Sequence, residues 1–380
     1  MKTNQYIIAV LVASLVLLSA ITVTPIEAKP GGKRVLAHTD DEVKNAISNG
    51  CKIVRETKGL KALDCNPAVA DSLGLQEDIQ LFAVDTKANT QIGADTVQAS
   101  GNTGAGRKVV VIDTGYNYNH PELSSSYLGG RDFVNNDSDP LDDNGHGSHV
   151  AGIITADGID SKARGVAPDA GVISVKVLDA SGSGFFSDTV AAIYWAVDGP
   201  DGIPNTADDF GADAISLSLG SSAPYTYKGF CDNVMPDMTN AIKYAMSRGT
   251  IVVVAAGNSG GSGVSIPGCI SYSTTIGAVD SADKIASFSG RGKAVDVTTP
   301  GVGIYSTWLG TSYATASGTS MATPVTSGTV ALIKSAHPTY TPDQVQNALI
   351  KTAKDLGKRG FDTSYGWGRV SASDAVNYIQ

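Results

Sequence analysis

The sequence is poor in charge and lacks any segment that concentrates positive charge. Lysine, arginine, aspartate and glutamate make up only 17% of the 380 residues, the net charge is −9, and no block of lysine and arginine occurs. Proteins that bind nucleic acid or anionic membrane surfaces usually carry a basic patch, so we expect neither partner. Cysteine is also scarce, with four residues. Hydrophobic residues, at 42%, are nevertheless sufficient for the core of a globular protein.

Long hydrophobic runs are missing as well, except at the N-terminus. Lys2 is followed by the apolar run Tyr6–Ile21, and Ala28 is a suitable cleavage residue. This pattern predicts a signal peptide at residues 1–28, since the run is short for a stable membrane span. A retained N-terminal anchor is the alternative. We therefore expect a secreted, extracellular protein without membrane contact after signal removal, in which the four cysteines form two disulfides.

Residues 29–85 differ in composition from the rest of the chain, with dense charge and few glycines. Lys52–Arg55 and Gln80–Val84 are predicted strands, and Asp40–Ser48 is a predicted helix with its apolar residues on one side. We expect a small α+β unit here. The polar, glycine-containing stretch at residues 87–107 suits a connector to the remaining domain, residues 86–380.

From Lys108 onward, short apolar runs alternate with amphipathic patterns. The predicted strands are Val109–Asp113, Val172–Val177, Ala214–Leu219, Ile251–Ala256 and Thr274–Val279. Helical spacing of apolar residues occurs around residues 190–197 and 238–246, and Gly249 is placed to end the second helix. Alternation of this kind predicts an α/β fold: a doubly wound, mostly parallel sheet with helices on both faces.

Four polar residues stand where such a fold carries its chemistry, at the carboxyl ends of strands or at a helix start. Asp113 ends an apolar strand, and Asn258 follows another in a glycine-rich turn. His146 lies in the segment NGHGSHVAG; a metal pair formed with His149 is the alternative, although no further ligand has a matching spacing. Ser320 precedes a long apolar helix, and Pro324 places it near the N-terminus, where backbone N–H groups favour negative charge.

The order Asp, His, Asn, Ser, with the surrounding residues, resembles the subtilisin-like serine peptidases from about residue 80 to the C-terminus. The matching segments are VVVIDTG (109–115), NGHGSHVAG (144–152), ISLSLG (215–220), AAGNSG (255–260), GTSMATP (318–324) and YGWGRVSASDAV (365–376). Ser148 is a departure, since many relatives have threonine there.

The resemblance implies a role for each of the four residues. Ser320 would be the nucleophile of an acyl-enzyme mechanism, His146 the general base and then acid, and Asp113 the group that orients His146. The Asn258 side chain and the backbone N–H of Ser320 would form the oxyanion hole. The chain would then be a serine endopeptidase acting on polypeptide substrates.

The resemblance also places the S1 pocket between two segments, Leu217-Ser218-Leu219-Gly220 and Ala255-Ala256-Gly257. Their small residues and lack of charge imply broad specificity with an apolar P1 preference. Pro267 resembles the family's cis proline near this pocket. A silent subtilase fold serving as a binding module is an alternative, as is a sedolisin-like acid peptidase, which would lack His146 and Asn258.

Residues 29–85 resemble a family prosegment that assists folding, inhibits the enzyme and is removed by self-processing between about residues 80 and 90. Its C-terminal strand would run into the active site. We expect the mature enzyme to be a monomer, with its own prosegment as a binding partner.

Acidic loops predict structural Ca²⁺, which prefers several oxygen ligands. One candidate loop resembles a calcium site of thermostable family members and contains Asp132, Asn135, Asp137 and Asp139. A second contains Asp198, Asp201, Asn205, Asp208 and Asp209. A weaker third candidate pairs Glu122 with the loop Asp157–Ala163. Solvated acidic turns are the alternative for each.

Four cysteines allow three disulfide pairings. We predict Cys51–Cys65 and Cys231–Cys269, because either other pairing would tether the prosegment to the enzyme after cleavage. Cys51 and Cys65 flank a stretch that could fold as a hairpin. The loops of Cys231 and Cys269 follow predicted neighbouring strands and can meet. Free thiols are the alternative.

Overall fold

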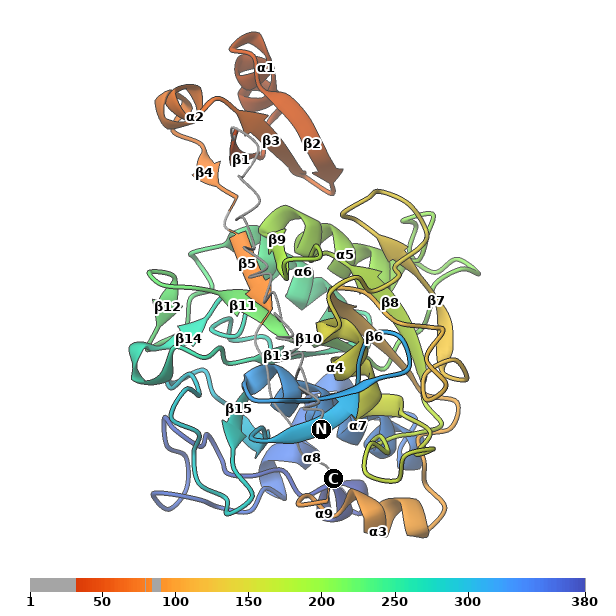
Figure 1. The fold of residues 1–380 in the computed structure, drawn as a ribbon. Coiled ribbons are helices and arrows are strands. Elements are labelled where there is room, and N and C mark those ends of the chain that lie inside the picture. Colours follow the sequence, from red (N-terminus) through yellow and green to blue (C-terminus); the bar gives the residue numbers. More distant parts are fainter. Residues whose placement is uncertain (1–31, 79, 84–89, 380) are drawn as a thin grey trace, which may run out of the picture.

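The computed structural model describes residues 32–78, 80–83 and 90–379, and shows a small N-terminal module above a large α/β domain (Figure 1). The predicted signal peptide lies outside the described residues. Across those residues, no helix is both long and apolar enough to cross a membrane.

The small module is an antiparallel sheet in the order β2-β3-β1-β4, packed against two helices. Its elements are β1 (Lys33–Ala37), α1 (Asp40–Ser48), β2 (Lys52–Thr57), β3 (Leu60–Cys65), α2 (Pro67–Leu73) and β4 (Gln76–Glu77). Helix α1 has the predicted bounds because Thr39 and Glu42 form a capping box at its start. The α+β prediction for this segment is confirmed at the level of these elements.

Within the described part of the large domain, seven parallel strands form the central sheet, as predicted for this fold class. Their order across the sheet is β16 (Val297–Pro300), β15 (Thr274–Val279), β13 (Ile251–Ala255), β10 (Ala214–Leu217), β6 (Lys108–Asp113), β8 (Gly171–Lys176) and β7 (Tyr127–Asp132). All five predicted strands are present, and β15 has the predicted bounds.

Helices cover both faces of this sheet (Figure 1). Val110 and Ile112 of β6 pack with α5 (Phe186–Asp198) and α6 (Pro236–Ser247). Val109 and Val111 pack with the opposite layer, which contains α3 (Ala94–Ala99), α4 (His146–Thr155), α7 (Thr319–Ala336), α8 (Pro342–Lys351) and α9 (Ala372–Val376). Because alternate side chains of a strand enter opposite cores, both must be apolar, which explains the unbroken hydrophobic runs in the sequence.

The predicted strand Ala214–Leu219 is wrong in one respect: the structure divides it at Ser218. Strand β10 ends at Leu217, and β11 (Leu219–Ser221) leaves the main sheet. It joins a separate sheet in the order β11-β5-β9, whose central strand is β5 (Gln80–Ala83) and whose other edge is β9 (Ser183–Phe185). The predicted strand Gln80–Val84 is therefore present at Gln80–Ala83, and Val84 lies outside the described residues.

Short elements that the sequence did not indicate complete the fold. They are β12 (Thr226–Tyr227), a 3₁₀ turn at Gly260–Ser262, β14 (Val264–Ser265), β17 (Ile304–Thr307) and β18 (Tyr313–Ala316).

Both predicted disulfides are confirmed. Cys51–Cys65 joins the two ends of the β2–β3 hairpin, and Cys231–Cys269 joins the loops that follow β10 and β13. These two strands are neighbours in the sheet, as the pairing argument required.

Candidate active site

Asp113 and His146 meet at the carboxyl edge of the central sheet. Asp113 is the last residue of β6 and His146 is the first residue of α4. The Nδ1 atom of His146 lies 2.6 Å from Oδ1 of Asp113, and both side chains are buried. Asp113 Oδ1 also accepts a hydrogen bond from the backbone N–H of Thr114. This arrangement fixes the imidazole ring and supplies a negative charge to stabilise its protonated form.

The glycines beside His146 are required by close backbone contacts. Gly145 has φ +106°, a conformation that side chains other than glycine rarely adopt. A Cβ atom on Gly147 would lie 2.2 Å from the carbonyl oxygen of Gly115, in the loop after β6. The start of α4 can therefore approach the end of β6 closely enough for His146 to reach Asp113.

Ser320 lies in the first turn of α7, where the sequence placed it. Its hydroxyl donates a hydrogen bond to the carbonyl oxygen of Ser218 at 2.9 Å, and the Ser218 hydroxyl donates to the carbonyl of Ser320 at 2.6 Å. Pro324 has no N–H with which to bond the carbonyl of Ser320 four residues earlier. The hydroxyl of Ser218 supplies that missing donor, so the break between β10 and β11 supports the first turn of α7.

Asn258, in the turn after β13, is oriented by Thr319. The Oδ1 atom of Asn258 accepts hydrogen bonds from the backbone N–H and the hydroxyl of Thr319, at 2.9 and 3.0 Å. The Thr319 hydroxyl in turn accepts one from the N–H of Gly257. With its oxygen committed, the amide group of Asn258 can offer only N–H donors to another partner.

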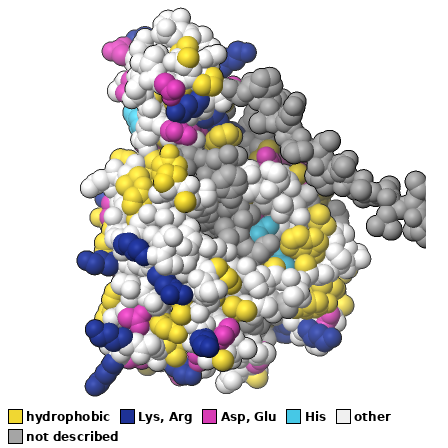
Figure 2. Space-filling model, turned by 60° about the vertical axis from the view of Figure 1, so that its left-hand side comes forward, with side chains coloured by type: hydrophobic (Ala, Val, Ile, Leu, Met, Phe, Trp, Pro, Cys, Tyr) yellow, Lys and Arg dark blue, Asp and Glu magenta, His cyan; other side chains and the backbone are white. Residues whose placement is uncertain are grey.

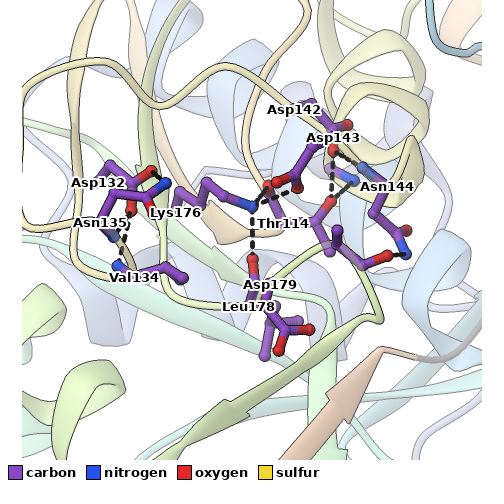
Figure 3. A network of polar contacts seen from close by, with 12 residues as sticks. Thr114, Asp132, Val134, Asn135, Asp142, Asp143, Asn144, Lys176, Leu178 and Asp179 are labelled. Atoms are coloured by element: carbon purple, nitrogen blue, oxygen red, sulfur yellow. Dashed lines mark hydrogen bonds and ion pairs between the residues drawn. The ribbon is translucent and has the colours of Figure 1, made fainter. Parts of the chain in front are cut away.

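Asp142 connects the Asp113 and His146 segments, and the sequence gave no sign of this role (Figure 3). One carboxylate oxygen accepts hydrogen bonds from the Thr114 hydroxyl and the N–H of Gly145, and the other accepts from the N–H and hydroxyl of Ser148. Burial alone would raise the pKa of Asp142, but these hydrogen bonds outweigh it and leave the pKa below its ordinary value. Ser148, where many relatives have threonine, therefore retains the side-chain hydroxyl that donates a hydrogen bond to Asp142.

Lys176, the last residue of β8, is a second supporting residue that the sequence analysis missed (Figure 3). Its side chain is 1% exposed, and Nζ donates hydrogen bonds to the carbonyls of Thr114 and Leu178 and to the carboxylate of Asp143. A lysine at the end of a strand that is mostly apolar was the available signal, because buried lysines are rare unless paired.

A three-stranded arrangement lies beside the Ser320 turn, with β5 in its centre. Strand β5 pairs antiparallel with β11, where Ala83 faces Leu219, and antiparallel with β9, where Gln80 faces Phe185. An extended segment of the N-terminal region thus occupies the groove between β9 and β11, which is how an extended peptide adds to open strand edges.

The comparisons with known proteins agree with this geometry. The family model described as the subtilase family, Peptidase S8, matches residues 104–368. The chain belongs to the subtilase family.

Relatives span most of the chain. The thermophilic serine proteinase of Bacillus sp. (strain AK1) is 40% identical over 275 residues, which is 72% of this chain and 62% of that protein, so less than two thirds of it is covered. The alkaline protease of Alkalihalobacillus alcalophilus is 37% identical over 84% of this chain and 80% of its own length. Thermitase of Thermoactinomyces vulgaris is 38% identical over 72% and 90%. As a subtilase, the chain is a serine endopeptidase.

The residues predicted to line the S1 pocket of this subtilase all flank the Ser320 turn, but they contribute in different ways. The side chains of Leu217, Leu219 and Ala256 pack in the α5–α6 core, so only their backbone can line a pocket. Gly257 has φ +84°, and a Cβ there would lie 2.1 Å from the hydroxyl of Ser265. A Cβ on Gly220 would lie 3.0 Å from Cβ of Ser265. The Ile266–Pro267 peptide bond is cis, as the resemblance implied.

In the first predicted calcium loop, the aspartate carboxylates accept hydrogen bonds, mostly from other residues of the same loop. The carboxylate of Asp132 accepts hydrogen bonds from the backbone of Val134 and from the backbone and side chain of Asn135. Asp137 accepts from the N–H of Asp139, and Asp139 from the Tyr118 hydroxyl.

In the second loop, three of the predicted ligands gather around one side chain. The Thr206 hydroxyl lies 3.4, 2.7 and 3.2 Å from carboxylate oxygens of Asp201, Asp208 and Asp209. Asn205 accepts a hydrogen bond from Arg248. Asp198 is directed elsewhere: it is buried and contacts Lys58 of the small module and the hydroxyl of Tyr244.

Glu122 contacts the loop Asp157–Ala163 through backbone N–H groups, which donate hydrogen bonds and are not metal ligands. Its buried carboxylate accepts from the N–H groups of Gly158, Ile159 and Asp160. Within the described residues, no group of three or more histidine, cysteine, aspartate or glutamate side chains could hold a metal ion as arranged.

Proposed function

We propose that Ser320, His146 and Asp113 form the catalytic triad with which this endopeptidase cleaves peptide bonds. The Ser320 hydroxyl attacks the peptide carbonyl carbon while His146 takes its proton, and His146 then protonates the departing amine. Water hydrolyses the acyl-enzyme in the same manner. The observation that carries this proposal is the 2.6 Å contact between His146 and Asp113 at the same sheet edge as the Ser320 turn.

Before attack, the Ser320 hydroxyl must turn from the carbonyl of Ser218, its present acceptor, towards His146. The negative charge that develops on the substrate oxygen would be met by the Asn258 amide and the backbone N–H of Ser320. Both donors are preoriented, the first by Thr319 and the second by the start of α7, so no reorganisation is needed in the transition state.

For specificity we propose an apolar P1 preference with broad tolerance at other positions. The segments 217–220 and 255–257 bring backbone and small residues to the proposed S1 pocket and carry no charged side chain. Main-chain pairing with β9 and β11 would hold the rest of the substrate irrespective of its sequence.

We further propose that residues 29–85 are an inhibitory prosegment of a secreted, self-processed and otherwise monomeric enzyme. Strand β5 supports inhibition, because it fills the groove that a substrate would need. The link from β5 to Thr90 contains residues 84–89, which lie outside the described part of the chain; the proposed processing bond falls there or in β5.

Two measurements on the full-length protein test this function. A serine-directed fluorophosphonate probe should label the wild type and not Ser320→Ala. The variant should also accumulate as an uncleaved proprotein, while the wild type releases a fragment containing the disulfide Cys51–Cys65. Absence of labelling in the wild type would favour the silent binding module, and processing of Ser320→Ala expressed alone would refute self-cleavage.

Calcium remains a separate proposal. The loop that contains Asp201, Asp208 and Asp209 places three carboxylates around Thr206 with Arg248 nearby. As arranged, these carboxylates do not form a metal site, so they would have to turn towards one another to bind Ca²⁺, which prefers oxygen ligands and would stabilise the fold. The loop of Asp132 is the weaker candidate, since Asp132 is already satisfied by its own loop.

A further inference from the structure

The small module contacts the first turn of α5 through two arginines that share one carboxylate. Asp188 is 6% exposed. Its Oδ1 accepts a hydrogen bond from Nε of Arg55 at 2.6 Å, and its Oδ2 lies 3.4 Å from an Nη atom of Arg34. Hydrogen-bonded pairs of guanidinium and carboxylate are among the stronger polar contacts in proteins.

Two phenylalanines of the catalytic domain complete the site. The guanidinium carbon of Arg34 lies 3.7 Å from the ring centre of Phe185, and that of Arg55 lies 4.9 Å from the ring centre of Phe133. These residues line a cavity of about 270 Å³ together with Asp188. A carboxylate flanked by aromatic faces is suited to a guanidinium group, which can stack and form hydrogen bonds at the same time.

This site lies on the path of an extended chain through the active-site groove. Strand β5 pairs with β9 so that Gln80 faces Phe185, and two residues earlier the carboxylate of Asp78 accepts hydrogen bonds from the N–H and hydroxyl of Ser187. The Arg34 guanidinium spans the gap from Asp78, at 2.9 Å, to Asp188. The space between Asp78 and Asp188 is therefore the size of one guanidinium group, which contacts both carboxylates.

We propose that, once the prosegment has left, Asp188 with Phe185 and Phe133 forms a subsite for an arginine side chain of the polypeptide substrate. The arginine would stand at the chain position of Asp78, on the N-terminal side of the scissile bond and beyond the segment that pairs with β9 and β11. This inference rests on the proposed function, because it assumes that substrates follow the path of β5.

Charge on the surrounding surface favours the same class of substrate. Lys58 contacts Asp198 at the end of α5, and His38 contacts Asp237 in the first turn of α6. Figure 2 shows acidic and basic side chains mixed on the small lobe next to its junction with the main body. Removal of the prosegment takes Arg34, Arg55, Lys58 and His38 away and leaves a surface carrying three carboxylates, which attracts basic segments.

The test uses mature enzyme and synthetic peptides with the sequence of residues 74–90. One has the natural Asp78, one carries Asp78→Ala and one carries Asp78→Arg; a peptide of residues 80–90 measures cleavage without the subsite. We expect kcat/KM for the Asp78→Arg peptide to exceed that for Asp78→Ala by about fivefold, through KM, and the advantage to shrink as salt is raised. In Asp188→Asn enzyme the ratio of the two should fall to near one.

Two further variants keep the result interpretable. Asp237→Asn removes one of the three carboxylates of this surface, away from the β5 path, so it should lower the preference much less than Asp188→Asn does. Phe185→Leu removes the stacking surface and should reduce the preference, so the subsite remains testable if Asp188→Asn fails to fold.

The outcomes separate the two proposals. Equal cleavage of the Asp78→Arg and Asp78→Ala peptides by wild-type enzyme, or a preference that persists in Asp188→Asn, overturns the subsite alone. Failure of wild-type enzyme to cut the 80–90 peptide overturns the proposed substrate path and the subsite with it.

Discussion

Nζ of Lys176 lies 2.7 Å from the carbonyl oxygen of Thr114, the residue that follows Asp113. The same ammonium group binds Leu178 and Asp143, so one buried cation joins the ends of β6 and β8 to the loop before His146. Lys176 therefore helps to set the relative position of Asp113 and His146 through residues that are their neighbours in the chain.

Lys176→Met should therefore destabilise the fold and lower kcat. The substitution leaves two buried carbonyl oxygens without their donor, for which we expect a loss of about 2–3 kcal/mol in the free energy of unfolding. Asp143 is half exposed and can be resolvated, so it should add little. Urea denaturation in a Ser320→Ala background, which would prevent autolysis, measures this loss. Lys284→Met, at an exposed position, is the control and should change stability by less than about 0.5 kcal/mol.

Thr319→Val should lower kcat with little change in KM. It removes the hydroxyl that holds Oδ1 of Asn258, while the backbone hydrogen bond from residue 319 remains. Asn258→Ala, which removes the donor itself, should cost about 10²–10³-fold in kcat, and Thr319→Val should cost less. Steady-state kinetics on one peptide substrate compares the two. An effect of Thr319→Val on KM alone would argue against an orienting role.

The buried carboxyl group of Asp296 should make the folded protein less stable as the pH rises from weakly acidic to neutral. Burial raises the pKa of Asp296 to about 7, although the N–H of Thr275 lowers it in part. A carboxyl group whose pKa is raised in the folded state favours folding when protonated. Its contribution is therefore lost as the pH rises from about 4 to about 7, and it changes little above that range.

The substitution Asp296→Asn should remove this pH dependence. It keeps an oxygen acceptor for Thr275, so we expect the variant to be more stable than the wild type at pH 8 by about 1–2 kcal/mol, and similar to it at pH 4. Thermal unfolding at both pH values in the Ser320→Ala background checks this. A variant less stable than the wild type at pH 8 would show that the charged form is favoured.

Chelation of calcium should lower the thermal midpoint and speed autolysis. Bound metal stabilises the native state in proportion to the logarithm of its concentration over Kd. Asp201→Ala should remove more of the calcium-dependent stabilisation than Asp137→Ala, because Asp201 shares Thr206 with two other carboxylates. Calorimetry with and without chelator compares the variants, and an unchanged midpoint in wild-type protein would exclude a stabilising calcium ion.

The sequence predicted the parts of the molecule that local chemistry determines. Asp113 ends a strand whose residues are apolar throughout, and Pro324 confines Ser320 to the start of a helix. The pairing Cys231–Cys269 followed from the expected release of the prosegment, and the adjacency of two predicted strands supported it. These inferences needed only short segments, general rules for parallel sheets and the expected processing.

The remaining features depend on contacts between distant segments. Residues 214–219 form one predicted strand, and only the hydrogen bonds between Ser218 and Ser320, 102 positions apart, show where this strand breaks. Asp142 lies in the sequence just after the candidate calcium loop that ends at Asp139, and only the structure shows that it binds Thr114 and Ser148. Asp198 was assigned with the acidic loop that follows it, whereas its contacts are with Lys58 and Tyr244.

The central position of β5 has a consequence for the enzyme that would remain if residues 29–85 are released as proposed. Strands β9 and β11 then become two facing edges with unpaired backbone groups, and such edges readily capture any extended chain. A folded protein rarely has an exposed, unpaired strand that could pair with β9 and β11 at the same time. The enzyme should consequently discriminate between targets more by their local unfolding than by their sequence, and cut flexible loops and termini before ordered regions.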